Sequence, residues 1–568
     1  MSKLYDAKFF SSRLLGQSRF FTEPGAVMDI AWRENNQEIA DLYVKSLQDV
    51  LSLLPIKDYE LNVKVFPSGI NVALRYPYDL LMVACEILDW VWDDVVDFWD
   101  LQQDINLKRA VTKFKKMIKE NQQILLRKIY QKALLKKVNF SIHKDILVLG
   151  SGVKQFSCPL NQITKIGDIP WAKIGNIPTV LITGTNGKTT TTRLTEFICR
   201  RAKLKSGYCS TDWVMVNGRL VTEGDLSGPT GHQYVLMHPK VEVAVLEVAR
   251  GGIVKRGLLP NYASVATVTN IAYDHIGQNG IDSLEDLAEA KGIVYQGLAD
   301  DGIALINLDD KYIVNLDNHN RNCSYLSTKL NEAEISTYLR ASNFVVFLDD
   351  GFITIKTATE KYKLNKIDSI PITVNGLATY NFENALQAVG LCFAVGVLPE
   401  QIKRGLAKFG ADEKSNFGRW NYYHSKSHGH LVVDIAHNPA GLENILSLAQ
   451  QFRKLHNLTG KLGLMYGNTA DRCSTIPEIV EIIRKYKVDN IVIKEFQESL
   501  RGSELGEMPQ VFYDELIKSG YSSEQLQIIP NEMDAVQHIL QSAKPEDMYL
   551  LCSHEQITEV SRLLRSIT

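Results

Sequence analysis

The residues that decide the fold run Thr179-Val-Leu-Ile-Thr-Gly-Thr-Asn-Gly-Lys-Thr-Thr190. An apolar strand, a glycine-bearing turn and the helix-like run 192–201 follow one another closely. Backbone N–H groups of such a turn, together with the N-terminus of the next helix, form a cradle for phosphate oxygens. Lys188 would then reach the β- and γ-phosphates of a nucleotide, and the Thr189 hydroxyl would bind Mg²⁺.

This glycine loop is shorter than the general P-loop, which has a glycine five residues before Gly187, where this chain has Ile182. A plain glycine turn is the alternative, and the strand–turn–helix context argues against it. The sequence therefore predicts a phosphate-binding loop made of Gly184, Thr185, Asn186, Gly187, Lys188, Thr189 and Thr190.

Apolar strands alternate with helical segments from residue 177 onward, which predicts a parallel α/β sheet. The predicted strands are 179–183, 241–246, 265–269 and 303–308, followed by a second series at 431–435, 462–466, 490–493, 527–529 and 548–552. The polar, glycine-bearing stretch 410–430 separates the two series. We expect a central ATP-binding domain over 171–425 and a C-terminal, Rossmann-like α/β domain over 426–568.

Residues 1–170 have a different character and predict an α+β domain that docks substrate. Residues 61–66 alternate like a strand, and 78–99 have helical spacing. Between Lys108 and Lys137 the chain has eleven Lys or Arg and one acid, Glu120. A helix or helical pair with a solvated basic face is the plain interpretation of this segment. A docking surface for an acidic polymer is the alternative.

Length and composition describe an ordinary globular protein. The 568 residues suffice for three domains, and 45% are hydrophobic and 23% charged. The formal charge of −2 argues against binding nucleic acid through bulk charge. Eight cysteines without a CxxC pair indicate reduced thiols and no structural zinc. Because the N-terminus has no apolar signal core and no run approaches 18 apolar residues, we expect a cytoplasmic protein without a membrane partner.

Two further polar motifs lie at the ends of predicted strands, where ligands gather in an open α/β sheet: Glu247 and Thr269-Asn270-Ile-Ala-Tyr-Asp274-His275. Glu247 could hold a divalent cation near the phosphates, with a solvated acid as the alternative. Asp274 and His275 could bind a second metal or orient substrate, although loops at strand ends are commonly polar. Lys291 lies in the amphipathic run 284–297, where an exposed helical lysine is the plain alternative.

Taken in order, these motifs resemble the central domain of the Mur ligase family. The resemblance extends to Asn381-Phe-Glu-Asn384, Gly418-Arg419 and Asp434-Ile-Ala-His437-Asn438-Pro439. Six ordered matches are far more specific than any one of them. The family implies an N-terminal substrate domain, a central P-loop ATPase domain, and a C-terminal α/β domain that closes over the nucleotide.

The resemblance also implies catalytic roles. Lys188 and Thr189 would bind triphosphate and Mg²⁺, while Glu247 and His275 would complete the metal sites. Lys291 matches a lysine that many family members carbamylate to gain an extra metal ligand.

Other matched residues would contact the nucleotide from the far side of the cleft. Asn381 and Asn384 would face it, and Arg419 and Asp434 would contact phosphate and ribose across the domain cleft. His437 lies at the same strand end as Asp434 without an assigned role.

Within the family, Gly224–Pro229, Glu247–Ile253 and Ser499–Gly502 resemble the C-terminal half of cyanophycin synthetases. Gly150–Gln155 resembles the phrase with which those enzymes enter an ATP-grasp domain. Residues 156–178 are too few for such a domain, so one of the two ligase activities of those enzymes has no place in this stretch.

The resemblance implies an ATP-dependent, ADP-forming ligase that activates a carboxylate as an acyl phosphate and couples it to an amine. The carboxylate would belong to an aspartyl peptide and the amine to an amino acid such as arginine. The alternative is a polymer- or peptide-binding scaffold that uses ATP only to change conformation, which the basic segment favours. The interpretation as a nucleic-acid enzyme has only local basic charge in its favour. The sequence does not decide whether the protein forms a homo-oligomer.

Overall fold

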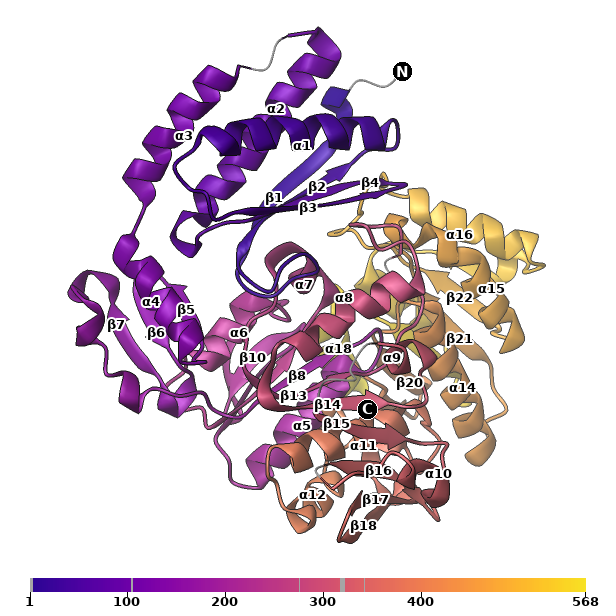
Figure 1. Ribbon diagram of the computed structural model, residues 1–568. Helices are drawn as coiled ribbons and strands as arrows, with labels where there is room; N and C mark the ends of the chain where they lie inside the picture. The colour runs from indigo at the N-terminus through magenta and orange to yellow at the C-terminus, as the bar shows by residue number, and fades with distance from the viewer. Residues whose placement is uncertain (1–3, 104–105, 275, 317–321, 342) are drawn as a thin grey trace.

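A computed structural model of the protein describes residues 4–103, 106–274, 276–316, 322–341 and 343–568. Within these ranges the strands form two small sheets in the first third of the chain and two large sheets after it. Figure 1 shows the N-terminal sheet and its helices above the large central sheet, with the C-terminal sheet beside the latter. Within the same ranges, every helix is too short or too polar to cross a bilayer.

The N-terminal sheet is antiparallel, with the strand order β1-β2-β4-β3. Its strands are β1 (Lys8–Leu14), β2 (Gly25–Ala31), β3 (Glu60–Phe66) and β4 (Gly69–Arg75). Helices α1 (Asn36–Leu53) and α2 (Leu81–Leu101) cover one face of it (Figure 1). The strand and helix predicted at 61–66 and 78–99 are confirmed as β3 and α2.

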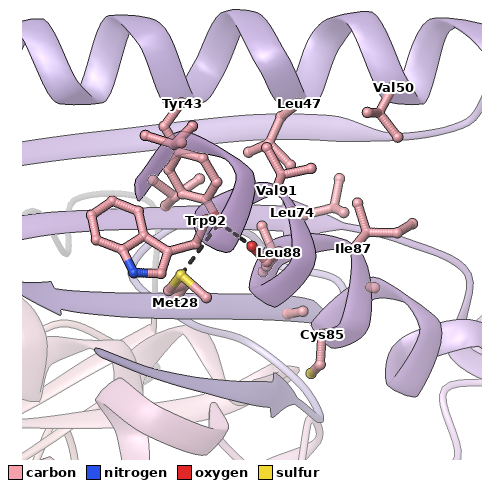
Figure 2. Close-up of a cluster of buried hydrophobic side chains, with 14 of the residues drawn as sticks. Met28, Tyr43, Leu47, Val50, Leu74, Cys85, Ile87, Leu88, Val91 and Trp92 are labelled. Carbon is pink, nitrogen blue, oxygen red and sulfur yellow. Dashed lines mark hydrogen bonds between the residues drawn. The ribbon is translucent and has the colours of Figure 1, made fainter. Parts of the chain in front are cut away.

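The core of this sheet holds large aromatic side chains (Figure 2). Tyr43 of α1 and Trp92 of α2 are fully buried, and their rings meet edge to face at 5.6 Å. The Tyr43 hydroxyl donates to the Leu88 carbonyl at 2.7 Å. A buried hydroxyl needs such an acceptor, because an unpaired one would be costly in an apolar core.

The basic segment is a helical pair, α3 (Leu107–Asn121) and α4 (Ile124–Leu135). Phe114 and Ile118 are buried against the N-terminal core, whereas Lys115 and Lys116 are exposed. The prediction of a helical pair with a solvated basic face is therefore confirmed. Helix α4 packs on a small sheet of β5 (Phe140–His143), β6 (Ile146–Leu149) and β7 (Phe156–Pro159). Residues 160–178 add single-turn 3-10 helices.

The central sheet has the order β11-β10-β9-β12-β8-β13-β14-β15-β16-β17-β18. The P-loop strand β8 (Thr179–Thr183) lies between two parallel neighbours, β12 (Val243–Glu247) and β13 (Ala263–Val268). The other strands are β9 (Ser206–Cys209), β10 (Trp213–Val216), β11 (Arg219–Glu223), β14 (Leu298–Asn307), β15 (Asn322–Ser327), β16 (Phe344–Asp349), β17 (Phe352–Thr357) and β18 (Lys361–Lys366).

Helices cover both faces of β8, which explains why all its residues are buried. On one face, Ile182 packs with α5 (Lys188–Arg201), α11 (Tyr380–Ala394) and α12 (Pro399–Leu406). On the other, Leu181 packs with α7 (Arg250–Arg256) and α8 (Leu284–Gln296). The remaining helices here are α6 (Pro229–Leu236), α9 (Lys311–Val314), α10 (Glu332–Ser336) and α13 (Glu413–Asn416).

The C-terminal sheet has the order β19-β20-β24-β21-β22-β23. Its strands are β19 (Asn421–Ser425), β20 (Gly429–Asp434), β21 (Leu462–Tyr466), β22 (Asn490–Ile493), β23 (Leu526–Ile528) and β24 (Met548–Cys552). Its helices are α14 (Pro439–Leu455), α15 (Ile476–Lys485), α16 (Glu507–Lys518), α17 (Glu532–Ser542) and α18 (Ile557–Ile567). The stretch predicted as a separator, 410–430, contains α13 and β19, and β19 pairs antiparallel with β20.

Candidate active site

The loop between β8 and α5 needs its two glycines. Gly184 and Gly187 have φ angles of 145° and 83°, which disfavour other residues. A Cβ atom at Gly187 would lie 2.2 Å from Asn384 Oδ1, and one at Gly184 would lie 1.8 Å from Thr269 Oγ1. The loop is thus held between α11 and the end of β13.

Residues that directly follow β13 hold this loop through hydrogen bonds. The Thr269 hydroxyl donates to the Asn186 carbonyl at 2.6 Å, and the Asn186 N–H donates to Asn270 Oδ1 at 3.0 Å. From the C-terminal sheet, the Asn438 amide donates to Asn186 Oδ1 at 3.0 Å. The motif at residues 269–270 therefore positions the phosphate loop.

Lys188 is folded against its own loop. Its ammonium donates to the carbonyls of Gly184 at 3.0 Å and Thr185 at 2.9 Å. Burial lowers the pKa of Lys188, and the nearby Glu247 carboxylate acts in the opposite direction. A cation held in this way would interact strongly with phosphate oxygens, because little water screens it.

Glu247, at the end of β12, forms the floor of the site. Its Oε2 accepts a hydrogen bond of 2.9 Å from the Thr189 hydroxyl. Its Oε1 is buried and has no hydrogen-bond partner within the described residues. Burial raises the pKa of Glu247, while the charge of Lys188 lowers it. A carboxylate oxygen left over beside a hydroxyl fits a hard divalent cation, which takes oxygen ligands.

The third predicted metal ligand, His275, lies outside the described residues. Across the part of the chain that the structure describes, no group of three or more His, Cys, Asp or Glu side chains forms a metal site. Thr189 and Glu247 are described side chains that could hold Mg²⁺ beside the phosphates of ATP.

Lys291 of α8 is buried, with 4% of its surface exposed, so the alternative of an exposed helical lysine is wrong. Its ammonium donates to the Gly184 carbonyl at 2.7 Å, beneath the phosphate loop. Burial first, and then the charge of Lys188, lowers the pKa of Lys291 well below its ordinary value. The structure therefore places Lys291 at the phosphate loop, and the carbamylation that the family resemblance implies stays a prediction.

A cavity of about 370 Å³ opens above the loop and is lined from both large sheets. It contains every predicted nucleotide-binding residue except Gly184, whose carbonyl faces the two lysines. Asn384 donates to Asn381 Oδ1 at 2.9 Å, and Asp434 accepts from the Trp420 N–H at 2.8 Å. Sequence reasoning missed the lining residues Thr211, Asp212, Tyr380, Arg472, Phe496, Arg501 and His554.

A second cavity, of about 490 Å³, adjoins the first. Lys188, Thr211 and His437 line both. The second cavity also includes Arg250 and Arg256 of α7, the carboxylates of Asp225 and Asp274, and Lys291. The two spaces meet at Lys188, where the γ-phosphate of a bound nucleotide would lie.

An ion pair links the two sheets over this junction. Arg472, after β21, donates to Asp274 Oδ1 at 3.0 Å, and His437 Nε2 lies 4.0 Å from Asp274 Oδ2. His437 Nδ1 is 2.9 Å from the Ile435 carbonyl, which can only accept, so its proton is on Nδ1. Burial and the nearby Arg472 lower the pKa of His437 to about 3, which keeps the imidazole neutral.

The shortened P-loop, the strand-end glutamate and the second α/β sheet lie in two segments that match known domain families. Residues 182–392 match the Mur ligase middle domain, and residues 418–554 match the Mur ligase, glutamate ligase domain. The chain belongs to the Mur ligase family. The sequence resemblance to that family is thereby confirmed, together with the predicted fold class.

The chain is 33% identical over 363 residues to cyanophycin synthetase of Crocosphaera subtropica, covering 64% of this chain and 41% of that protein. The chain therefore spans about two fifths of the length of that relative. It is 25% identical to UDP-N-acetylmuramoyl-L-alanyl-D-glutamate--2,6-diaminopimelate ligase 1 of Clostridium acetobutylicum. That match covers 65% of this chain and 71% of the relative. A bifunctional folylpolyglutamate synthase/dihydrofolate synthase from Yersinia pestis, solved with AMPPNP and Mn, has a TM-score of 0.48 and 17% identity over 68% of this chain and 88% of that one.

Proposed function

We propose that the protein is an ATP-dependent, ADP-forming ligase that joins a carboxylate to an amine through an acyl phosphate. The observation that carries this proposal is the junction of two cavities at Lys188. A nucleotide in the first cavity would present its γ-phosphate to a carboxylate in the second. The family membership and the ligase names of both relatives support the same chemistry.

The residues of the junction would carry the phosphoryl transfer. Lys188 would stabilise negative charge on the β- and γ-phosphates, and the loop N–H groups would hold the phosphate oxygens. Thr189 and Glu247 would hold Mg²⁺, which when bound neutralises further charge on the phosphates. The amine would then attack the acyl phosphate and release inorganic phosphate. Arg472 and Asp274 would keep the second sheet closed over the junction, which protects the anhydride from water.

For substrates, we propose the carboxylate of an aspartyl peptide and an amino acid such as arginine. The similarity to cyanophycin synthetase supports this choice. The second cavity is lined by the basic residues Arg250, Arg256, Lys188 and Lys291 and by the acids Asp225 and Asp274. Such a wall favours an anionic acceptor. Residues 1–170 would dock the rest of that acceptor, and residues 171–425 and 426–568 would form the two catalytic domains.

A mass-spectrometric screen of carboxylate and amine pairs with MgATP tests this proposal. We expect an amide product, and ADP release that requires both substrates. ATP turnover that ignores both substrates would favour the alternative, a scaffold that uses ATP only to change conformation. Hydroxylamine should intercept the acyl phosphate and give a hydroxamate, whereas release of AMP and pyrophosphate would overturn the mechanism.

A further inference from the structure

His554 follows β24 and lines the first cavity together with His437, with 6.1 Å between the two ring centroids. Its Nε2 is buried and has no hydrogen-bond partner within the described residues. Buried polar atoms in folded proteins are almost always paired, so an unpaired one on a cavity wall suggests a ligand partner. Neither the phosphate loop nor the metal residues account for this atom.

A buried ion pair lies behind His554. Glu532 of α17 contacts the ammonium of Lys494, and both side chains are almost fully buried. The Glu532 carboxylate also accepts from the Ser553 hydroxyl at 2.6 Å and from the N–H groups of His554, Glu555 and Gln556 at 2.8, 3.2 and 2.9 Å. The loop that carries His554 is therefore wrapped around one carboxylate.

These donors fix the charges of the pair. Burial alone would raise the pKa of Glu532, but Lys494 and the surrounding donors lower it below its ordinary value. Burial lowers the pKa of Lys494, and the direct contact with the Glu532 carboxylate acts in the opposite direction. An ionised Glu532 keeps Lys494 protonated, because a lone buried carboxylate would be very costly. The Lys494 ammonium also lies 3.9 Å from the centroid of the Phe496 ring, a favourable cation–π distance.

A protonated Lys494 decides the tautomer of His554. Its Nζ lies 3.0 Å from His554 Nδ1, and an ammonium can only donate. His554 Nδ1 must therefore accept, and the single proton of the neutral ring is on Nε2. Burial and the charge of Lys494 lower the pKa of His554 well below its ordinary value, so the ring stays neutral. The wall of the cavity thus presents a fixed N–H donor.

Two arginines of the C-terminal domain, Arg472 and Arg501, line the same cavity. Each also contacts a carboxylate, Arg472 that of Asp274 at 3.0 Å and Arg501 that of Asp471 at 2.8 Å. In the proposed reaction the phosphates belong to the P-loop, which leaves the carboxylate of the incoming amino acid as the anion without a partner. We propose that the Nε2–H of His554 donates to this carboxylate, and that Lys494 and Glu532 are positioning residues that hold the imidazole in that tautomer. This inference rests on the proposed ligase function.

The test compares L-arginine with agmatine, which lacks the carboxylate, as amine substrates of the full chain. We expect His554→Ala to raise the KM for arginine about tenfold or more, and to change the KM values for agmatine and ATP less than twofold. His554→Gln, which can accept from Lys494 and donate to the ligand, should recover much of the loss. His538→Ala, on the same domain but lining neither cavity, is the matched control. An unchanged KM for arginine, or an equal rise for agmatine, would overturn the proposal.

A second measurement does not depend on turnover. Nitrogen-15 NMR of labelled histidine should show the Nε2–H tautomer for His554 in the wild-type protein and a mixture of tautomers in Lys494→Met. An Nδ1–H tautomer in the wild-type protein would refute the positioning role, even if Lys494→Met does not fold. Wild-type protein that releases no ADP with arginine would instead overturn the proposed amine, and the tautomer result would still decide the role of Lys494.

Discussion

Lys188 is the residue on which nucleotide chemistry depends most directly, because it is the cation shared by both cavities. We expect Lys188→Ala to lower kcat/KM for ATP by about 10²–10³-fold or more, since it removes charge stabilisation at the γ-phosphate. ADP release measures the loss, and a thermal melt followed by circular dichroism checks the fold. Lys205→Ala, an exposed lysine paired with Glu242, is the control and should keep full activity. Full turnover in folded Lys188→Ala would remove Lys188 from the mechanism.

The position of Glu247 predicts how Mg²⁺ affects the thermal stability of the protein. Glu247→Gln keeps an acceptor for the Thr189 hydroxyl but removes a buried charge whose Oε1 is unpaired within the described residues. We expect the variant to be as stable as the wild type without Mg²⁺, because burying an incompletely paired carboxylate is costly. With ADP present, Mg²⁺ should raise the Tm of the wild type and have little effect on the variant. Glu242→Gln, just before the same strand, is the control. An equal rise in Tm with Mg²⁺ in all three proteins would show that Glu247 does not hold the metal.

At the scale of elements, the phosphate loop depends on contact between α5 and α11. Gly187→Ala combines a positive φ with a clash against Asn384 Oδ1, whereas Gly396→Ala has a similar φ of 87° and open space around its Cβ. We expect Gly396→Ala to cost about 1–2 kcal/mol of unfolding free energy, which is the cost of the backbone conformation alone. Gly187→Ala should cost more and should weaken ADP binding.

Urea denaturation and calorimetric titration with ADP provide these measurements. Adding Asn384→Ala to Gly187→Ala should restore part of the stability, because it removes the atom that clashes. If both glycine variants lose the same free energy and bind ADP alike, the packing of α11 on the loop does not constrain it.

The sequence predicted strands best where an apolar run ends abruptly. The bounds of β8, β21, β22 and β24 agree with the predictions, because each is a short, largely buried run bounded by proline, glycine or polar residues. Strand β14 begins at Leu298, five residues before the predicted start, since Asp300 and Asp301 interrupt the apolar pattern. Strands β15–β18 were not predicted, although β16 with β17 and β17 with β18 form antiparallel pairs of strands that follow one another directly in the chain.

At the scale of the whole molecule, the N-terminal domain meets the central one at a half-buried carboxylate. Asp29 of β2 accepts from Asn279 at 3.3 Å, and burial raises its pKa to about 6 despite the nearby Lys255 and Arg19. A folded pKa above the unfolded value of 3.8 means that the folded protein binds the proton more tightly. The contribution of Asp29 is thus full below about pH 4 and is lost as pH rises through about 6.

We therefore expect Asp29→Asn to be more stable than the wild type at pH 8, by up to about 3 kcal/mol, and to lose this advantage near pH 4. Urea denaturation at both pH values measures the difference. An advantage of the variant that does not change with pH would show that Asp29 does not titrate in this range.

The active site is a property of the folded whole, which limits what its sequence could reveal. Lys188, Thr189 and Glu247 could be predicted because they follow their strands in recognisable motifs. Arg472, Phe496 and His554 could not, because each is a single residue in a loop that meets the phosphate loop only when the C-terminal sheet closes over it. Arg501 lies within the phrase Ser499–Gly502, whose family resemblance implies no role for its side chain.

That closure can be tested through Asp274 and Arg472, whose 3.0 Å contact joins the central and C-terminal sheets. We expect Asp274→Ala and Arg472→Ala each to lower kcat/KM, because a misplaced sheet cannot complete the cavity. If the two residues act through their contact, the double variant should be little worse than the poorer single one, with a coupling of about 1–3 kcal/mol. Steady-state ADP release from the four proteins completes the cycle. Strictly additive losses would mean that each side chain serves a ligand on its own, and that other contacts, such as Asn438 with Asn186, hold the sheets together.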